Sequence, residues 1–320
     1  MREYLKAVAI FPSEYPSDRL ELDTVFEARS STEQSSIAVA ISGREYLGPY
    51  HLLKLIRAGK ATLVWEAFDP DNHRIAIKVL QRQHCNDKVE VASLRHEYTV
   101  GRELNHPNVN RILEFNVTRG MAYVAMDFFD GLNLKQSIRQ SAQLVAEQYE
   151  HIVRQAGAGL QHLHEHDWVH CDVKPDNFLL DEKGDVRLID FSIATKVKKG
   201  LARILPRRSR VQGTRSYMSP EQIRGAALDP RSDVYSFGCV VYELGCGKLP
   251  YTGVSADDLL NRHLRAPIPP LSAATDRFSQ DFSDLVASMM AKKADQRPKS
   301  IAKVIEMLDD IRIHRRKSSA

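Results

Sequence analysis

The sequence predicts an α+β protein in which a small β-rich lobe is followed by a larger, mainly helical lobe. Short strand-like runs separated by turn residues fill residues 48–130. After Gly131 the chain instead carries long stretches with helical periodicity. Its 320 residues are 43% hydrophobic and 27% charged, which is typical of a globular chain long enough for two lobes, each with its own core.

The β-rich lobe follows an N-terminal extension over residues 1–47, which mixes apolar clusters with Ser, Thr and acidic residues. One helix is expected within this lobe, over residues 89–104. The expected strands cover residues 51–56, 61–68, 75–80, 112–117 and 121–128. Turn residues such as Asp69-Pro70-Asp71-Asn72 separate neighbouring strands, which indicates an antiparallel meander.

The helical lobe is expected over residues 131–312. Amphipathic periodicity predicts helices near residues 144–165, 229–246, 255–264, 280–291 and 299–312. Residues 313–320 form a basic C-terminal tail, for which a solvated, helix-ending segment is the preferred interpretation.

Composition excludes several classes of function. The net charge of +4 is too small for wholesale nucleic-acid binding, so no specific nucleic acid is expected as a partner. The chain has no apolar run of transmembrane length and no secretory signal, so no transmembrane segment is expected. Its four cysteines are scattered without a C-x-x-C pair, which argues against a zinc site or a disulfide framework and favours a cytoplasmic location.

The most specific segment is His170-Cys171-Asp172-Val173-Lys174-Pro175-Asp176-Asn177. It offers a carboxylate that can accept a hydroxyl proton (Asp172), a phosphate-neutralising cation (Lys174) and a metal ligand (Asn177). Thirteen residues after Asn177, Asp190-Phe191-Ser192 supplies a second metal ligand in Asp190. Phosphoryl transfer requires such a set, because the transferred group is highly anionic. The competing interpretation is a polar turn with a buried Asp.

These two motifs resemble the H-R-D-x-K-P-x-N catalytic loop and the D-F-G motif of the eukaryotic-like protein kinases. A third segment, Gly213 to Glu221, resembles the G-T-x-x-Y-M-A-P-E segment that positions peptides in that family and that small-molecule kinases usually lack. The resemblance covers residues 48–312. It implies the bilobal protein kinase fold, with MgATP as the source of the phosphoryl group.

The resemblance also implies which residues bind the nucleotide. The segment Ile75-Ala76-Ile77-Lys78 resembles the V-A-I-K strand of the family. Lys78 would therefore bind the α- and β-phosphates, and Glu97 would form an ion pair with Lys78. Seen alone, such a pair would be interpreted as a surface salt bridge. The other implied nucleotide-binding residues are Gly59 of the Gly-rich loop, Val64, Ala76 and Leu179 around the adenine, Met126 at the back pocket, and the backbone of Asp127 and Phe129 at the hinge.

Three further positions match structural residues of the family. Asp233 corresponds to the helix-borne Asp that holds the backbone of the catalytic loop, and Arg297 corresponds to the buried partner of Glu221. These positions are diagnostic of the fold whether or not the chain is catalytic.

Several motif positions depart from the family pattern. Arg57 and Thr62 replace the outer two glycines of the Gly-rich loop, so that loop is expected to be stiffer and to make fewer phosphate contacts. Ser192 replaces the glycine of D-F-G, and Cys171 replaces the arginine of H-R-D, which removes the usual clamp for a phosphorylated activation loop. Gly101 replaces a bulky apolar residue of the helix that carries Glu97.

Residues 190–221 carry eight basic residues against two acidic ones. This local field would attract protein substrates that are acidic near the acceptor, although a solvated loop without such a role is an equal alternative. Lys174 and Thr214 match the pattern that accompanies Ser/Thr specificity in the family.

The function predicted from these motifs is a protein serine/threonine kinase that transfers the γ-phosphoryl group of MgATP to protein hydroxyls. The alternative is a pseudokinase, a nucleotide-binding regulatory scaffold with little catalysis, and it is motivated by the departures at Arg57, Thr62, Ser192 and Gly101. A small-molecule phosphotransferase is a third candidate, which the Gly213 to Glu221 segment disfavours.

Overall fold

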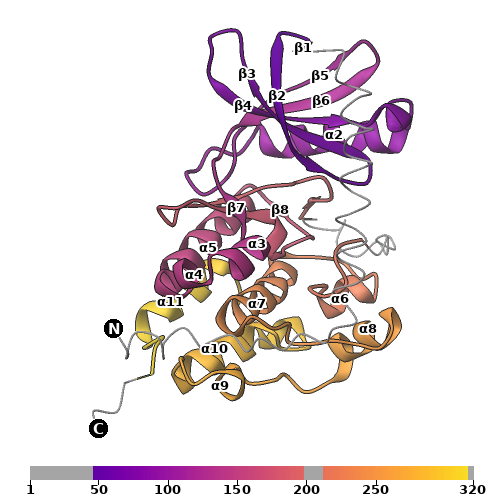
Figure 1. The fold of residues 1–320 in the computed structure, drawn as a ribbon. Helices are drawn as coiled ribbons and strands as arrows, with labels where there is room; N and C mark the ends of the chain where they lie inside the picture. The colour runs from indigo at the N-terminus through magenta and orange to yellow at the C-terminus, as the bar shows by residue number, and fades with distance from the viewer. Residues whose placement is uncertain (1–45, 198–211, 316–320) are drawn as a thin grey trace. The chain divides into compact units, whose positions relative to one another are not determined.

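The computed structural model describes residues 46–197 and 212–315 (Figure 1). The chain divides into two compact units. Within the described residues, the first unit comprises residues 46–98 and 112–128, and the second comprises residues 99–111 and 129–315. The first is built on an antiparallel sheet and the second is mainly helical, which confirms the predicted α+β class.

The first unit is a six-stranded antiparallel sheet in the order β1-β2-β3-β4-β6-β5. Its strands are β1 (Tyr46–Leu47), β2 (Tyr50–Ala58), β3 (Thr62–Phe68), β4 (Arg74–Leu80), β5 (Ile112–Thr118) and β6 (Met121–Asp127). A 3₁₀ turn, η3 (Arg82–His84), and the helix α2 (Lys88–Gly101) connect β4 to β5. All five predicted strands and the predicted helix are present within a few residues of their expected ends.

The two faces of this sheet differ in burial. Side chains alternate along a strand, so residues two apart share a face, and paired residues on neighbouring strands share it too. One face carries the unit's core, in which Leu63, Ile77 and Tyr123 are fully buried. The opposite face carries Val64, paired with Lys78 on β4. The sequence pattern of β3 and β4 therefore separates a packed face from a more accessible one.

The second unit is built from short and long helices with two small sheets, a three-stranded one in the order β10-β9-β7 and a two-stranded one of β11 and β8. Its helices are α3 (Leu134–Gln140), α4 (Ala142–Glu147), α5 (Tyr149–Glu165), α6 (Pro220–Ile223), α7 (Pro230–Cys246), α8 (Ala256–Arg265), α9 (Leu271–Ala274), α10 (Gln280–Met289) and α11 (Ile301–Asp310). Its strands and 3₁₀ turns are β7 (Leu132–Asn133), β8 (Trp168–Val169), η4 (Pro175–Asn177), β9 (Phe178–Leu180), β10 (Val186–Leu188), β11 (Thr195–Lys196) and η6 (Ala294–Gln296).

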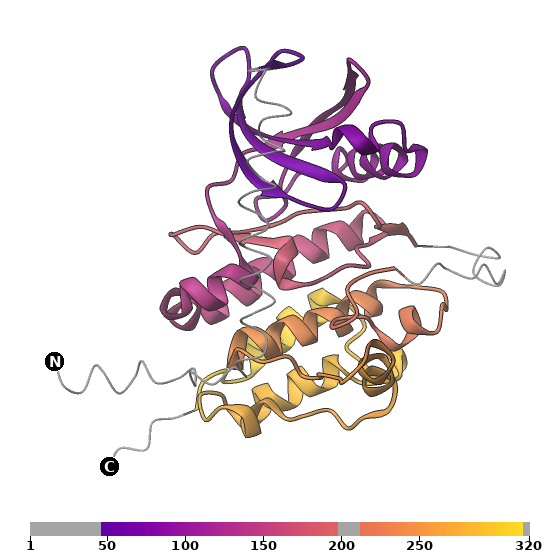
Figure 2. The same cartoon turned by 45° about the vertical axis from the view of Figure 1, so that its right-hand side comes forward.

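Helix α7 is the centre of the second unit (Figure 2). It contacts α5, α6, α9, α10 and β8, and every residue from Ser232 to Cys246 is buried. Local sequence sets its ends: the Asp229 side chain accepts a hydrogen bond from the backbone of Arg231, and Gly247 ends the helix in the left-handed conformation at φ 72°. In the described part of the chain, no helix has the length and apolar character needed to cross a bilayer.

Two expectations for the second unit need correction. The predicted helix over residues 144–165 is two helices, α4 and α5, which meet at Gln148. Hydrogen bonds of helical spacing run through the junction, but Gln148 has φ −104° and ψ 17°, which interrupts the regular helix. No Gly or Pro at this point of the sequence indicates the break. The start of the predicted solvated tail is packed: Ile313 is buried and its carbonyl accepts the Ser279 N–H.

His263 of α8 is fully buried in the second unit, with Nδ1 2.9 Å from the Tyr235 hydroxyl. Burial, helped by the nearby Lys292 charge, lowers the pKa of His263 to about 4 from 6.5. The unfolded chain therefore binds a proton at higher pH than the folded one. The stability that neutral His263 provides is present in full above pH 6.5 and is lost as the pH falls toward 4.

A His263→Gln variant tests this pH dependence. We expect the variant to be less stable than the wild type at neutral pH. We expect this difference to shrink by about 3 kcal/mol as the pH falls from 6.5 to 4, because glutamine has no proton to gain. Urea unfolding of both proteins across that range measures the difference. A gap that does not change with pH would contradict the assignment.

Candidate functional site

The segment His170 to Asn177 follows β8 in the second unit and is anchored to helix α7. The backbone N–H groups of His170 and Cys171 donate to the two carboxylate oxygens of Asp233, at 2.7 and 3.0 Å. Asp233 is 1% exposed, and His164 Nε2 lies 2.8 Å from one of its oxygens. A buried carboxylate with three such partners fixes the backbone that precedes Asp172.

Cys171 adopts a backbone conformation that is costly for a residue with a side chain. Its φ is 68°, in the left-handed region. The surroundings hold it there, since its carbonyl accepts a 2.7 Å hydrogen bond from Gln222 Nε2 and its N–H is bound by Asp233. Burial raises the pKa of the Cys171 thiol, so the sulfur stays protonated and acts as a packing group.

Asp172 lies at the centre of a network of hydrogen-bond donors. Oδ1 accepts from the backbone N–H and the hydroxyl of Thr214, at 2.8 and 2.9 Å. Lys174 Nζ lies 2.7 Å from Oδ2 and donates to the Thr214 hydroxyl at 2.9 Å. Asn177 Nδ2 donates to the Asp172 carbonyl at 2.8 Å. These hydrogen bonds hold the carboxylate in one orientation. The side chain is 15% exposed, so it remains in reach of solvent.

Asn177 and Asp190 lie on neighbouring segments of the same unit. The residue before Asp190, Ile189, donates its N–H to the Asn177 carbonyl at 2.9 Å. Asp190 has φ 66°, a second left-handed residue without glycine's freedom. Because Asn177 uses its amide nitrogen in bonds to Asp172, the side-chain oxygen is the atom that remains for a cation. This amide oxygen and the Asp190 carboxylate are both hard oxygen donors, the type that Mg²⁺ prefers.

In the first unit, Lys78 of β4 and Glu97 of α2 form a close ion pair. Lys78 Nζ lies 3.0 and 2.8 Å from the two carboxylate oxygens of Glu97. The side chains are only 14% and 3% exposed, so this pair is largely removed from water, unlike the surface salt bridge that a lone Lys-Glu pair would suggest.

The other predicted nucleotide-binding residues divide between the two units. Ala76 pairs with Met126 in the sheet, on the face that also carries Lys78 and Val64. Gly59 closes the β2–β3 turn by donating to the Thr62 carbonyl at 2.8 Å. Asp127 ends β6, and the remaining two residues lie in the second unit: Phe129, whose ring is covered by the Arg187 guanidinium at 4.8 Å, and Leu179 of β9.

Glu221 and Arg297 form a buried bidentate pair in the second unit. The guanidinium donates to both carboxylate oxygens, at 2.6 and 2.9 Å, and its side chain has no exposed area. It also donates to the carbonyls of Ala291 and Arg231, each at 2.7 Å. Glu221 lies in the first turn of the short helix α6, so this pair fixes the end of the segment that starts with Thr214 beside Asp172.

Sequence reasoning missed three parts of this arrangement. It did not predict that His164 supports Asp233, that Gln222 holds the Cys171 carbonyl, or that Thr214 donates twice to Asp172. Gln222 carries one available signal, because Ser219 and Gln222 have the spacing of a capping box, which both residues form at α6. His164 has no such signal, since its partner lies 69 residues away.

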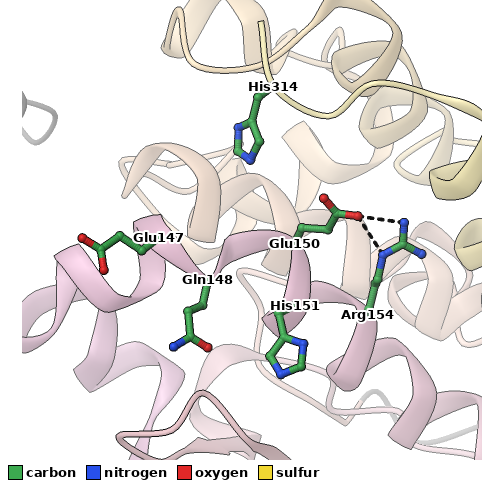
Figure 3. A pocket seen from close by; sticks show the side chains of 6 residues that line it. All are labelled: Glu147, Gln148, Glu150, His151, Arg154 and His314. Atoms are coloured by element: carbon green, nitrogen blue, oxygen red, sulfur yellow. Dashed lines mark hydrogen bonds and ion pairs between the residues drawn. The ribbon is translucent and has the colours of Figure 1, made fainter.

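A pocket of about 380 Å³ lies elsewhere in the second unit, along α4, α5 and the chain after α11 (Figure 3). It is lined by Glu147, Gln148, Glu150, His151, Arg154 and His314. Glu150 and Arg154 pair with each other at 2.8 Å, and Arg154 also reaches Asp309 on α11 at 2.7 Å. None of the predicted catalytic or nucleotide-binding residues lines this pocket, and one of its lining side chains, Arg154, joins α5 to α11.

Comparison with known families gives an independent result. Residues 50–308 match the family model described as the protein kinase domain. This match spans strands β2 to β6 of the first unit and nearly all the described helices of the second.

Curated relatives agree with that match. The chain is 30% identical over 251 residues to the serine/threonine-protein kinase PrkC of Bacillus subtilis, covering 78% of this chain and 38% of the relative. It is 30% identical over 271 residues to the probable serine/threonine-protein kinase PknB of Lactococcus lactis, covering 84% and 42%. It is 31% identical over 287 residues to the serine/threonine-protein kinase PknA of Mycobacterium tuberculosis, covering 82% and 65%. The chain thus spans about two fifths of the first two relatives.

Proposed function

Because this chain belongs to the protein kinase domain family, we propose that it is a serine/threonine protein kinase that transfers the γ-phosphoryl group of ATP to protein hydroxyls. The observation that carries the proposal is the oriented carboxylate of Asp172, surrounded by Lys174, Asn177 and Thr214. A scaffold without catalysis has no physical need for this arrangement, and none of the comparisons favours the pseudokinase alternative.

In this proposal Asp172 accepts the proton of the attacking hydroxyl. Lys174 stabilises the negative charge of the phosphoryl group as it moves, and Lys78, aligned by Glu97, holds the α- and β-phosphates. Catalysis of this kind consists mostly of positioning and charge stabilisation, which suits side chains that are already fixed by hydrogen bonds.

We propose Asn177 and Asp190 as the magnesium ligands. Their oxygen donors fit a hard divalent cation, and the 2.9 Å hydrogen bond from Ile189 to Asn177 ties the two segments together. Bound Mg²⁺ would neutralise negative charge on the phosphate oxygens. The departure at Ser192 is compatible with this role, since its N–H lies 3.4 Å from Asp190 Oδ1 and its side chain does not replace the carboxylate.

Around the adenine we propose Val64, Ala76 and Leu179 as the apolar contacts and Met126 as the residue at the back pocket. The backbone of Asp127 and Phe129 would bind the edge of the base. The pairing of Ala76 with Met126, on the face of the sheet that also carries Val64 and Lys78, supports this assignment. Gly59, in its hydrogen-bonded β2–β3 turn, would approach the phosphates.

The experiment that tests the proposed activity measures transfer of labelled γ-phosphate from MgATP to the purified protein and to a generic Ser/Thr acceptor protein. We expect phosphoserine or phosphothreonine after hydrolysis and no phosphotyrosine. Binding of MgATP without any transfer would instead support the pseudokinase alternative. Transfer to a small alcohol but to no protein would support a small-molecule phosphotransferase.

We further propose that substrates are acidic near the acceptor and that the domain works in a reducing, cytoplasmic environment. Lys196 and Arg215 are described members of the basic stretch, whereas Lys198 to Arg210 lie outside the described residues. Paired peptides that differ only in acidic or neutral flanks test the first point, with a lower KM expected for the acidic one. All four cysteines are free thiols, three of them buried, which supports the second point.

Replacing Lys78 with Met is expected to lower turnover about 100-fold, because the α- and β-phosphates lose their cation and Glu97 is left as an unpaired buried carboxylate. Steady-state phosphate transfer measures the loss. Lys88→Met is a matched control, since Lys88 is exposed at the start of α2 and should leave turnover unchanged. Equal turnover in the two variants would contradict the role of Lys78.

A further inference from the structure

Asp190, one of the two proposed magnesium ligands, has a backbone conformation that needs support from its surroundings. Its φ of 66° lies in the left-handed region, which a residue with a side chain adopts at a cost and only where neighbouring structure holds it there. The residue before it, Ile189, is fixed by its 2.9 Å hydrogen bond to the Asn177 carbonyl. The chain after Asp190 is fixed at the strand β11.

Strand β11 pairs with β8, which leads into the segment that carries Asp172. The two strands are antiparallel, with Lys196 opposite Trp168. Just beyond the strands, the Val197 N–H donates to the Asp167 carbonyl at 2.7 Å. Each strand is only two residues long, so the pair has few backbone hydrogen bonds and depends on side-chain contacts to stay in place.

Three side chains of the second unit supply such contacts. Lys196 Nζ lies 4.5 Å from the centre of the Trp168 ring and 3.6 Å from Glu103 Oε2. The Trp168 indole N–H donates to that same oxygen at 3.2 Å, and the ring is buried. The carboxylate thus faces both the cation and the indole donor, and each of the three residues contacts the other two. We call Glu103, Trp168 and Lys196 the β11 anchor.

The β11 anchor differs from the support that the sequence departure at Cys171 removes. Cys171 stands where related kinases carry the arginine that binds a phosphorylated activation loop. Its buried thiol donates to the Val169 carbonyl at 3.4 Å and brings no positive charge to this place. The anchor instead joins Lys196 to a carboxylate and a ring of the chain itself, so it needs no phosphate.

We propose that Lys196 is a positioning residue which, with Glu103 and Trp168, holds β11 on β8 and so keeps Asp190 in the conformation that binds Mg²⁺. This inference rests on the proposed kinase function and on the assignment of Asp190 as a metal ligand. Lys196 acts through the backbone between Asp190 and β11, not at the reacting atoms. Without the anchor, the segment detaches more often and the left-handed conformation at Asp190 loses its downstream support.

Hydrogen exchange of the full chain, followed by mass spectrometry without nucleotide, tests the anchor independently of activity. Lys196→Met should speed exchange of the fragment covering residues 190–197 about fivefold, because a cation–π contact and a half-exposed ion pair together shift an opening equilibrium by about that factor. Lys196→Arg should stay close to the wild type, since a guanidinium also stacks on indole and pairs with Glu103. Lys183→Met is the control, because Lys183 is exposed in the β9–β10 turn. Equal exchange in Lys196→Met and the wild type would overturn the proposal.

The Mg²⁺ dependence of phosphate transfer at saturating ATP tests the link to Asp190. The Mg²⁺ concentration for half-maximal transfer should rise about threefold in Lys196→Met and recover in Lys196→Arg. The double variant Lys196→Met with Glu103→Gln should need no more Mg²⁺ than Lys196→Met alone, because both substitutions break one anchor.

Two outcomes separate this inference from the proposed function. A raised KM for the protein substrate with an unchanged Mg²⁺ requirement would show that Lys196 acts by its charge on the substrate, and it would overturn the positioning role. Absence of transfer in the wild type would contradict the proposed kinase function, whereas the exchange of residues 190–197 would still decide whether the anchor holds β11.

Discussion

Replacing Asp172 with Asn is expected to lower phosphate transfer at least about 10³-fold while changing MgATP affinity by less than about threefold. The carboxamide cannot accept the hydroxyl proton. The local hydrogen bonds add to this loss, because Thr214 and Lys174 direct donors at the carboxylate. The NH₂ group of an asparagine side chain at this position is itself a donor, so it could not accept the hydrogen bond from one of these two residues.

The measurement pairs phosphate transfer from labelled ATP with calorimetric titration of MgATP. Asp185→Asn is the matched control, since Asp185 is exposed in the β9–β10 turn of the same unit and its loss should change turnover less than about twofold. Turnover within tenfold of the wild type in the Asp172 variant would remove Asp172 from the role of base. Loss of MgATP binding with loss of turnover would point to a disturbed fold instead.

The fold of this chain was largely predictable because its longer elements have clear periodicity. The strands β2 to β6 and the helices α7, α8, α10 and α11 all lie close to their predicted ranges. The short helices α3, α6 and α9 were not predicted, since four to seven residues give too little periodicity. The break at Gln148 was not predicted either, because it carries no glycine or proline.

The candidate site was predictable where its residues are close in the sequence, and it was not predictable where its contacts join distant residues. Asp172, Lys174 and Asn177 are close in sequence, so their spacing alone suggests a shared loop. The contacts that hold this loop come from elsewhere: His164 and Asp233 are far apart in the sequence, as are Gln222 and Cys171. A single sequence does not reveal which distant side chains meet, whereas the fold determines it.

Loss of Arg297 is expected to have the largest effect on stability. Arg297→Met should lower the free energy of unfolding by about 3–5 kcal/mol, because the Glu221 carboxylate loses its buried partner. The carbonyls of Ala291 and Arg231 lose their side-chain donor as well. Urea unfolding measures the change. Arg262→Met is the control, since its pair with Asp258 is exposed and should contribute less than about 1 kcal/mol.

A double variant distinguishes a buried charge from lost packing as the cause. If the cost of Arg297→Met comes from the unpaired carboxylate, adding Glu221→Gln should restore part of the stability, so the two substitutions together cost less than their sum. Simple additivity would show that the guanidinium acts mainly through packing on Tyr235 and its carbonyl contacts. Since Glu221 lies in the first turn of α6, which follows the segment carrying Thr214, the single Arg297 variant should also lose turnover under conditions in which it remains folded.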